Sequence, residues 1–257
     1  MENSCIVGMG MVGKTMAKVF GIKKYFSLDG STITLEEAAK CKYVFLCLPT
    51  PINPDGTYNT TDIEAIVKQI EGYGGAGIYI LRCTVWPGFA KHLMEQLGIN
   101  RIISNPEFLT EKTAEKDMKY PPFILLGGAN DAFLEDVKGF YEARIKSAPV
   151  IITDNTTAEM AKLALNAYFG TKVIFANQLY DSCKKLGANY EKVKDVFERH
   201  PFGPKNHFTI WFNGKRGVHG RCLPKDIIAF SHYTGLPLIA KILELNEGYI
   251  YEKDSAI

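Results

Sequence analysis

The sequence lacks any run of about 18 apolar residues, the length that a membrane-spanning helix requires. It also begins without the charged segment and long apolar stretch of a secretory signal, so neither a membrane protein nor a secreted one is expected. Charge of one sign is not in surplus, because 30 basic and 28 acidic residues leave a net charge of +2. This balance argues against nucleic acid as a partner.

Cysteine pairs of the C-x-x-C type are absent as well. Several of the six cysteines lie in apolar, strand-like segments, where a reduced thiol behaves as a small core residue. We therefore predict no metal site and a reducing, cytoplasmic compartment. The six are Cys5, Cys41, Cys47, Cys83, Cys183 and Cys222.

The 257 residues, 46% of them hydrophobic, can bury roughly three quarters of the unfolded chain's surface, enough for one large domain or two modest ones. Up to about residue 155, short apolar runs alternate with amphipathic stretches, which predicts a doubly wound α/β domain with a parallel sheet covered on both faces. The expected strands are 4–7, 24–28, 43–48, 78–82, 101–104, 123–126 and 150–153, and the expected helices are 11–20, 35–40, 61–73, 88–97 and 131–143.

The strand pattern stops after residue 153. Thr156 or Thr157 is expected to cap a long helix that runs to about Leu186, with Glu159 in its first turn. Further helices are predicted over 189–199, 224–233 and 237–253, and the long loop 201–222 between them is expected to be functional. The chain is thus predicted to hold a Rossmann-like domain over 1–155 and an all-helical domain over 156–257.

A glycine-rich stretch, Gly8-Met-Gly-Met-Val-Gly13, directly follows the first predicted strand and opens a helix. Its glycines permit a tight turn, a close approach to a pyrophosphate and close packing of the helix on the strand, while the helix N-terminus offers N–H groups to phosphates. Asp29, 21 positions after Gly8, suits a carboxylate that binds ribose hydroxyls and repels a 2′-phosphate, which favours NAD over NADP. The alternative is a packing turn without a ligand.

Five further segments follow in order: Leu48-Pro-Thr-Pro51, Cys83-Thr-Val-Trp-Pro-Gly88, Asn105-Pro-Glu-Phe-Leu-Thr-Glu111, Ala158-Glu-Met-Ala-Lys-Leu-Ala-Leu-Asn166 and Gly220-Arg-Cys-Leu-Pro-Lys-Asp226. Together with the glycine loop, this series resembles the UDP-glucose/GDP-mannose dehydrogenase family. The resemblance implies an NAD-dependent oxidoreductase that oxidises the C6 alcohol of a nucleotide sugar, of the UDP-glucose type, to a carboxylate in two steps.

Cys222 and Asp226 are four residues apart at the expected start of a helix. A helix N-terminus and the neighbouring Arg221, Lys225 and Lys162 would lower the pKa of the thiol and activate the sulfur. By resemblance, Cys222 attacks the aldehyde formed first, a thiohemiacetal becomes a thioester, and Asp226 positions or deprotonates the hydrolytic water. The alternative is a buried thiol and a first-turn acid that complements the helix dipole.

The spacing of Lys162 and Asn166 puts both on one helix face, where they can stabilise an oxyanion. By resemblance, Glu107 orients the ligand or a water, Glu111 is a second acid near the sugar, and the Thr84 hydroxyl holds the catalytic water. The resemblance also places the cofactor against Gly8, Gly10, Met11, Val12, Gly13, Asp29, Pro49, Thr50, Thr84 and Glu111, and the substrate against Glu107, Phe108, Leu109, Lys162, Asn166, Gly217 and Cys222.

The sequence departs from the family at a few positions. His219 stands where a glycine is usual, Thr110 replaces an arginine and Lys112 a glycine. The family's C-terminal nucleotide-binding domain is expected to be missing, so a second chain completes the site, the substrate is smaller, or the protein binds NAD without full catalysis. We expect a homodimer through the apolar helix 237–253. A second interpretation of the whole sequence is a β-hydroxyacid-type dehydrogenase.

Overall fold

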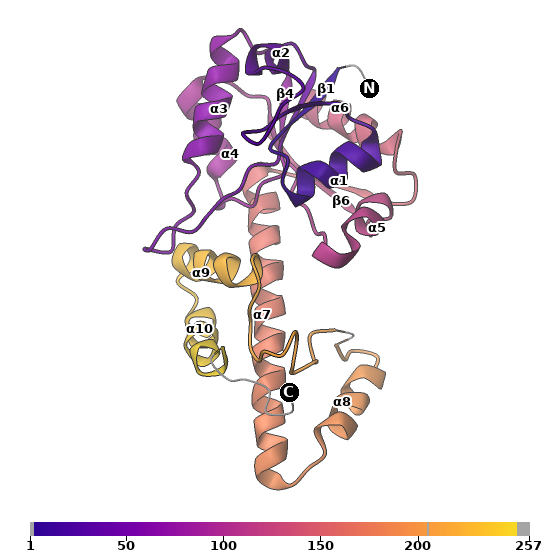
Figure 1. Ribbon diagram of the computed structural model, residues 1–257, viewed down its shortest axis with the longest axis vertical. Coiled ribbons are helices and arrows are strands. Elements are labelled where there is room, and N and C mark those ends of the chain that lie inside the picture. The colour runs from indigo at the N-terminus through magenta and orange to yellow at the C-terminus, as the bar shows by residue number, and fades with distance from the viewer. Residues whose placement is uncertain (1–2, 205, 251–257) are drawn as a thin grey trace. The chain divides into compact units, whose positions relative to one another are not determined.

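The computed structural model describes residues 3–204 and 206–250 of the chain. The chain divides into two compact units, one made of residues up to 53 together with 58–162, and the other of 54–57 together with the residues from 163 on. Figure 1 shows the elements of both. Among the described residues, no helix is long and apolar enough to cross a membrane.

The first unit is built on a seven-stranded sheet in the order β2-β1-β3-β4-β5-β6-β7. Its strands are almost continuously buried, except at the two edges. They are β1 Ser4–Val7, β2 Lys24–Phe26, β3 Tyr43–Leu46, β4 Ile78–Leu81, β5 Ile102–Ser104, β6 Ile124–Gly127 and β7 Val150–Thr153. The predicted α/β architecture is confirmed.

One strand pairing differs from the prediction of a wholly parallel sheet. β6 runs antiparallel to β5, with Ser104 opposite Gly127, and every other neighbouring pair is parallel. A parallel pair needs a connection that crosses back over the sheet. The connection from β5 to β6 does not cross back, so β6 starts near the carboxyl end of β5 and runs in the opposite direction. The expectation of parallel strands throughout is therefore wrong at this position.

Helices cover both faces of the sheet, as Figure 1 shows. On one face α2 Leu35–Ala39, α3 Thr61–Gly72 and α4 Phe89–Leu97 pack on the strands, and the core there includes Phe89, Leu93 and Ile63. On the other face lie α1 Met11–Phe20, α5 Ala114–Lys119 and α6 Asp131–Glu142, with a core that includes Met16, Phe45 and Leu126. The 3-10 turn η1 Glu111–Thr113 and α5 were not predicted.

The long helix α7 Asn155–Leu186 has 32 residues, of which those up to Lys162 belong to the first unit. It begins two or three residues earlier than expected, because its cap is Asp154 instead of Thr156 or Thr157. The Asp154 carboxylate accepts hydrogen bonds from the Thr157 backbone N–H (2.9 Å) and hydroxyl (2.6 Å). A carboxylate there satisfies a free N–H and complements the helix dipole.

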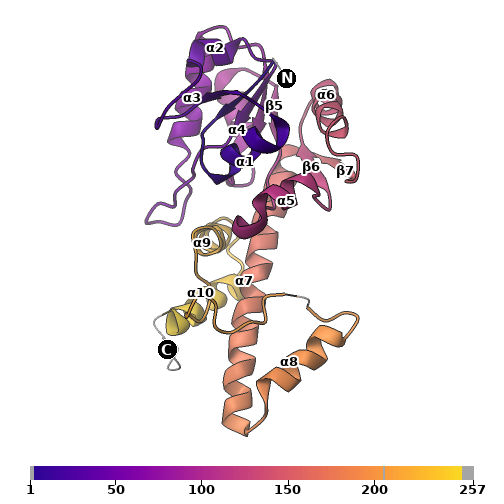
Figure 2. The same cartoon turned by 45° about the vertical axis from the view of Figure 1, so that its right-hand side comes forward.

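The second unit is helical. It contains the rest of α7 with α8 Tyr190–Arg199, α9 Leu223–Thr234 and α10 Pro237–Tyr249, and Figure 2 shows them from another side. Residues 251–253 of the predicted last helix lie outside the described residues. The loop between α8 and α9 has its own buried residues, Phe208 and Ile210, which pack on α7 and α8 around Tyr190. These two residues fix their part of the loop against the two helices.

Candidate active site

The glycine loop follows β1 and leads into α1. Gly8 has a φ of +97°, and a Cβ there would lie 2.6 Å from the carbonyl oxygen of Cys47 at the end of β3. A Cβ on Gly13 would lie 2.0 Å from the carbonyl oxygen of Gly8. Gly10 differs, because a Cβ there would meet no described atom within 4 Å. Two of the glycines are thus required by packing, and the third faces open space.

The surroundings of Gly10 fit a pyrophosphate. Gly10 is the N-cap of α1, no side chain caps the helix, and its first turn holds no acidic residue, so the backbone N–H groups of Met11, Val12 and Gly13 begin a helix whose dipole favours an anion. The loop follows β1, which lies between β2 and β3 in the sheet. At β1 the strand order changes direction, because β2 is added on one side and β3 on the other. Dinucleotides bind at the carboxyl ends of strands at such a switch point.

The other residues expected to bind the cofactor differ in their burial and in their hydrogen bonds. Asp29 is exposed in a turn three positions after β2, closed by a hydrogen bond from the Gly30 N–H to the Ser27 carbonyl (3.2 Å). Thr50 is buried, and its hydroxyl donates to the Thr84 carbonyl oxygen (2.7 Å), which joins the loops that follow β3 and β4. Pro49 is exposed beside it, and Glu111 is exposed at the start of η1.

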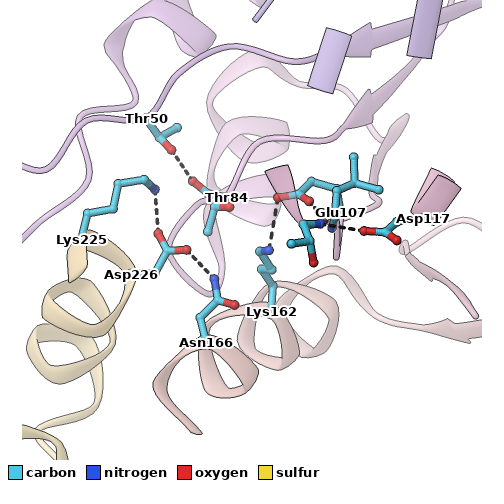
Figure 3. A network of polar contacts seen from close by, with 10 residues as sticks. Thr50, Thr84, Glu107, Asp117, Lys162, Asn166, Lys225 and Asp226 are labelled. Carbon is cyan, nitrogen blue, oxygen red and sulfur yellow. Dashed lines mark hydrogen bonds and ion pairs between the residues drawn. The ribbon is translucent and has the colours of Figure 1, made fainter. Parts of the chain in front are cut away.

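An ion pair in the first unit unites two of the predicted catalytic residues. Lys162 Nζ lies 3.2 Å from Glu107 Oε1, and both side chains are nearly buried, at 8% and 12% exposure. Glu107 Oε2 accepts a 2.6 Å hydrogen bond from the Leu109 N–H, and Lys162 Nζ also lies 5.4 Å above the Phe108 ring. Figure 3 shows Lys162 pointing toward Glu107. The Glu107 carboxylate is therefore fixed through both oxygens.

A buried network supports the loop that carries Glu107. Asn105 accepts hydrogen bonds at Oδ1 from Arg82 Nη1 (2.6 Å) and from the Tyr141 hydroxyl, and its Nδ2 donates to the Leu125 carbonyl (2.8 Å). All three side chains are buried. Arg82 and Tyr141 were not predicted to have a role. The signal that could have found Arg82 is a single arginine at the end of an apolar strand-like run.

Glu159 is also more than a first-turn acid. It is 3% exposed and accepts hydrogen bonds from the N–H groups of Gly88 (2.7 Å) and Ala90 (3.1 Å), at the start of α4, and from the Ser104 hydroxyl (2.9 Å). Burial raises the pKa of the Glu159 carboxyl to about 7, although these hydrogen bonds act in the opposite direction. Glu159 thus anchors the start of α4 to α7, one turn before Lys162.

In the second unit, Asp226 holds a second polar cluster. It is 1% exposed and accepts hydrogen bonds from Asn166 Nδ2 and from Lys225 Nζ, both at 2.6 Å. Figure 3 shows Asp226 between these two side chains. A buried carboxylate fixed by a cation and an amide fits a group that orients or deprotonates a water.

Cys222 is exposed, whereas the other five cysteines are buried. It is the N-cap residue of α9, followed by Leu223 and Pro224, and Asp226 lies one turn further along the helix. Gly217 in the loop before it has a φ of +76°. His219, the departure from the family pattern, is half-buried with its ring 5.8 Å from that of Phe212. A thiol at a helix N-terminus is in the setting that activates cysteine.

Comparison with known proteins gives these two units a family. Residues 22–145 match the NAD binding domain, and residues 156–247 the central domain, of the UDP-glucose/GDP-mannose dehydrogenase family. The chain belongs to this family. Residues 22–145, all but four of which lie in the first unit, accordingly belong to an NAD-binding domain, and NAD is its cofactor.

Individual members of the family show similarity over most of the chain. It is 28% identical to the UDP-glucose 6-dehydrogenase of Rickettsia felis over 232 residues, 86% of this chain and 51% of that protein. It is 28% identical to the GDP-mannose 6-dehydrogenase of Pseudomonas syringae over 243 residues, 87% and 54% of the two. A solved UDP-glucose dehydrogenase from Pyrobaculum islandicum shares the fold, with a TM-score of 0.83 at 24% identity over 96% of this chain and 68% of that one. The chain spans about half the length of the curated relatives it matches.

Proposed function

We propose that this chain oxidises the C6 alcohol of a nucleotide sugar to a carboxylate, with Cys222 as the nucleophile. One observation supports the proposal above the others. Of six cysteines, Cys222 alone is exposed, and it lies at a helix N-terminus one turn from the buried Asp226. A dehydrogenase that stopped at the aldehyde would have no use for an activated thiol in this place.

The proposed reaction removes four electrons in two steps. NAD supplies the acceptor for one hydride in each step. In the first, the alcohol loses its hydroxyl proton and a hydride from C6 to give the aldehyde. The Cys222 thiolate then adds to the aldehyde carbon, and the resulting thiohemiacetal loses a proton and a second hydride to become a thioester. Water cleaves the thioester, releasing the carboxylate and restoring the thiol.

The remaining polar residues have roles that suit these charges. Lys162 and Asn166, four positions apart on α7, stabilise the oxygen of the alkoxide and thiohemiacetal. Asp226 accepts a proton from the hydrolytic water, since its fixed carboxylate is an acceptor. Thr84, whose backbone carbonyl accepts a hydrogen bond from the Thr50 hydroxyl, holds that water through its own hydroxyl. Glu107 orients the substrate through its ion pair with Lys162.

NADH formation over a panel of UDP- and GDP-sugars tests the proposal. The relatives named above act on UDP-glucose and on GDP-mannose, so both series belong in the panel. We expect two NADH for each sugar consumed. NAD binding without turnover of any sugar would contradict the proposal and favour a module that binds NAD without catalysis, or one that a further chain completes.

Variants of Cys222 test the covalent step. A serine hydroxyl is almost wholly protonated at neutral pH, so Cys222→Ser is expected to stall at the aldehyde, with overall turnover lowered by several orders of magnitude. Unchanged four-electron turnover in Cys222→Ser refutes the covalent mechanism. Full activity of Cys222→Ala on small hydroxy acids would instead identify a β-hydroxyacid-type dehydrogenase.

A further inference from the structure

The loop before Cys222 is fixed to α7 through Arg216. This residue is 4% exposed, and its guanidinium donates to Asn177 Oδ1 (3.0 Å), to the Asn177 carbonyl (3.2 Å) and to Asp181 Oδ1 (2.8 Å). The Tyr249 ring of α10 lies 4.6 Å from the guanidinium. The chain therefore enters the segment ahead of the nucleophile from a rigid point.

Two residues later, a side chain of α10 pairs with the loop backbone. Asn246 Oδ1 accepts a 2.6 Å hydrogen bond from the Val218 N–H, and Asn246 Nδ2 donates to the Val218 carbonyl oxygen at 3.0 Å. A single amide thus satisfies both backbone groups of one buried residue. The fit is close, since a Cβ on Gly217 would lie 2.6 Å from Asn246 Oδ1 and 2.9 Å from Tyr249 Cβ.

Between Val218 and Asp226 the chain crosses an exposed segment and enters α9 at Leu223. Gly220 has a φ of +99° and open space around it, and residues 220–222 are exposed. Val218 and Asp226 are buried, and each is fixed by an amide, from Asn246 and Asn166 respectively. Cys222 lies midway between these two fixed points, so the first of them sets the direction from which the chain reaches the nucleophile.

We propose that Asn246 is a positioning residue that holds the Cys222 thiol at the N-terminus of α9 by fixing the Val218 backbone. The inference rests on the proposed function, in which Cys222 is the nucleophile. It makes the reactivity of the thiol depend on α10, a helix that does not contain it. Removing the amide would leave the buried N–H and carbonyl of Val218 without these partners. That state carries a desolvation penalty, which a shift of the loop would relieve.

The rate of Cys222 alkylation by iodoacetamide tests the inference, because it needs no sugar and the other five thiols are buried. Peptide mass spectrometry identifies the modified residue. At pH 7 we expect Cys222 of the folded protein to react faster than in the urea-unfolded chain, and Asn246→Ala to lose at least fivefold of that rate. Asn246→Asp keeps the acceptor for the Val218 N–H and should recover part of it.

Tyr190→Phe is the matched control for simple destabilisation. It removes the 2.8 Å hydrogen bond from the Tyr190 hydroxyl to the Phe208 carbonyl, in the same loop but 14 positions before Cys222. It should lower the melting temperature without changing the alkylation rate. With an active sugar substrate, Asn246→Ala should lower kcat and leave the KM for NAD unchanged.

Two results would overturn the inference. One is an alkylation rate in Asn246→Ala equal to that of the unaltered protein, and the other is a Cys222 that reacts no faster when folded than when unfolded. If Asn246→Ala does not fold, Asn246→Asp and Asn246→Gln give the same comparison. Absence of sugar turnover together with a slowed thiol would refute the proposed function while supporting the positioning role.

Discussion

Asn166 donates a 2.6 Å hydrogen bond to Asp226, a carboxylate that is 1% exposed. Asp226→Asn keeps the size of the side chain but removes its charge and its ability to take a proton. We expect thioester hydrolysis to slow by about two to four orders of magnitude, the usual contribution of a general base. A sugar adduct on Cys222 should then accumulate and be visible by intact-protein mass spectrometry. Full turnover without an adduct would show that Asp226 is not the base.

The glycine loop offers a matched pair of substitutions. A methyl group on Gly10 meets no described atom, so Gly10→Ala should leave the melting temperature unchanged and weaken NAD binding by occupying the space of the pyrophosphate. A methyl group on Gly13 would lie 2.0 Å from the Gly8 carbonyl oxygen, so Gly13→Ala should unfold or strongly destabilise the domain. Calorimetric NAD affinity and thermal melting separate the two, and unchanged affinity in Gly10→Ala would contradict the phosphate assignment.

The raised pKa of Glu159 predicts a pH dependence of stability. The folded state keeps this proton up to about pH 7, whereas the unfolded chain releases it near pH 4.5. Between these values the folded state binds more protons, so the free energy of unfolding falls as pH rises, by about 3 kcal/mol at most. Urea denaturation at pH 5 and pH 7.5 should show this fall in the unaltered protein and not in Glu159→Gln.

Asp154 provides a control of opposite sign for that experiment. Hydrogen bonds from Thr157 hold the pKa of the Asp154 carboxyl below its usual range, so its contribution to stability is lost as pH falls. Asp154→Asn should therefore flatten the acid side of the profile and leave the fall toward pH 7 in place. Parallel profiles for the unaltered protein and Glu159→Gln would contradict the assignment of the fall to Glu159.

Self-association is predicted through α10. Ile239 and Ile242 are buried within the second unit, but Leu238 on the same helix is 62% exposed. We expect a homodimer at micromolar concentration by light scattering, and a monomer for Leu238→Asp, since an apolar patch is what the charge disrupts. Leu28→Asp, at a residue of the first unit that is 95% exposed, is the control and should stay dimeric. A monomeric unaltered protein would refute the prediction.

Much of the first unit could be predicted because its strands are short apolar runs bounded by turns. The alternation of these runs with amphipathic helical stretches is visible in the sequence. The helix α5 escaped detection because it is short and polar: only Ala114 and Met118 of its six residues are buried, and no side chain caps it at Thr113. The direction of β6 was also out of reach. Hydrophobic periodicity gives the same pattern for either direction of a buried strand.

The candidate site divides in the same way. Cys222, Asp226, Lys162 and Glu107 could be named because each lies in a short motif with the family's spacing. The supports of these residues were missed because their partners are far apart in the sequence: Arg82 and Tyr141 are 59 positions apart, and Val218 and Asn246 are 28 apart. No local pattern encodes such pairs, which depend on packing.

Asn155, the first residue of α7, is 3% exposed, and its side-chain amide donates to the carbonyls of Ile102 (3.1 Å) and Gly127 (3.0 Å). These carbonyls belong to β5 and β6, the two strands that run in opposite directions. These two strands thereby fix the rotation of α7 about its own axis. A slip by one residue at Asn155 would rotate every later side chain by about 100°, which would turn Lys162 away from Glu107. The direction in which Lys162 points around the helix axis therefore depends on the one antiparallel strand pair of the sheet in the described chain.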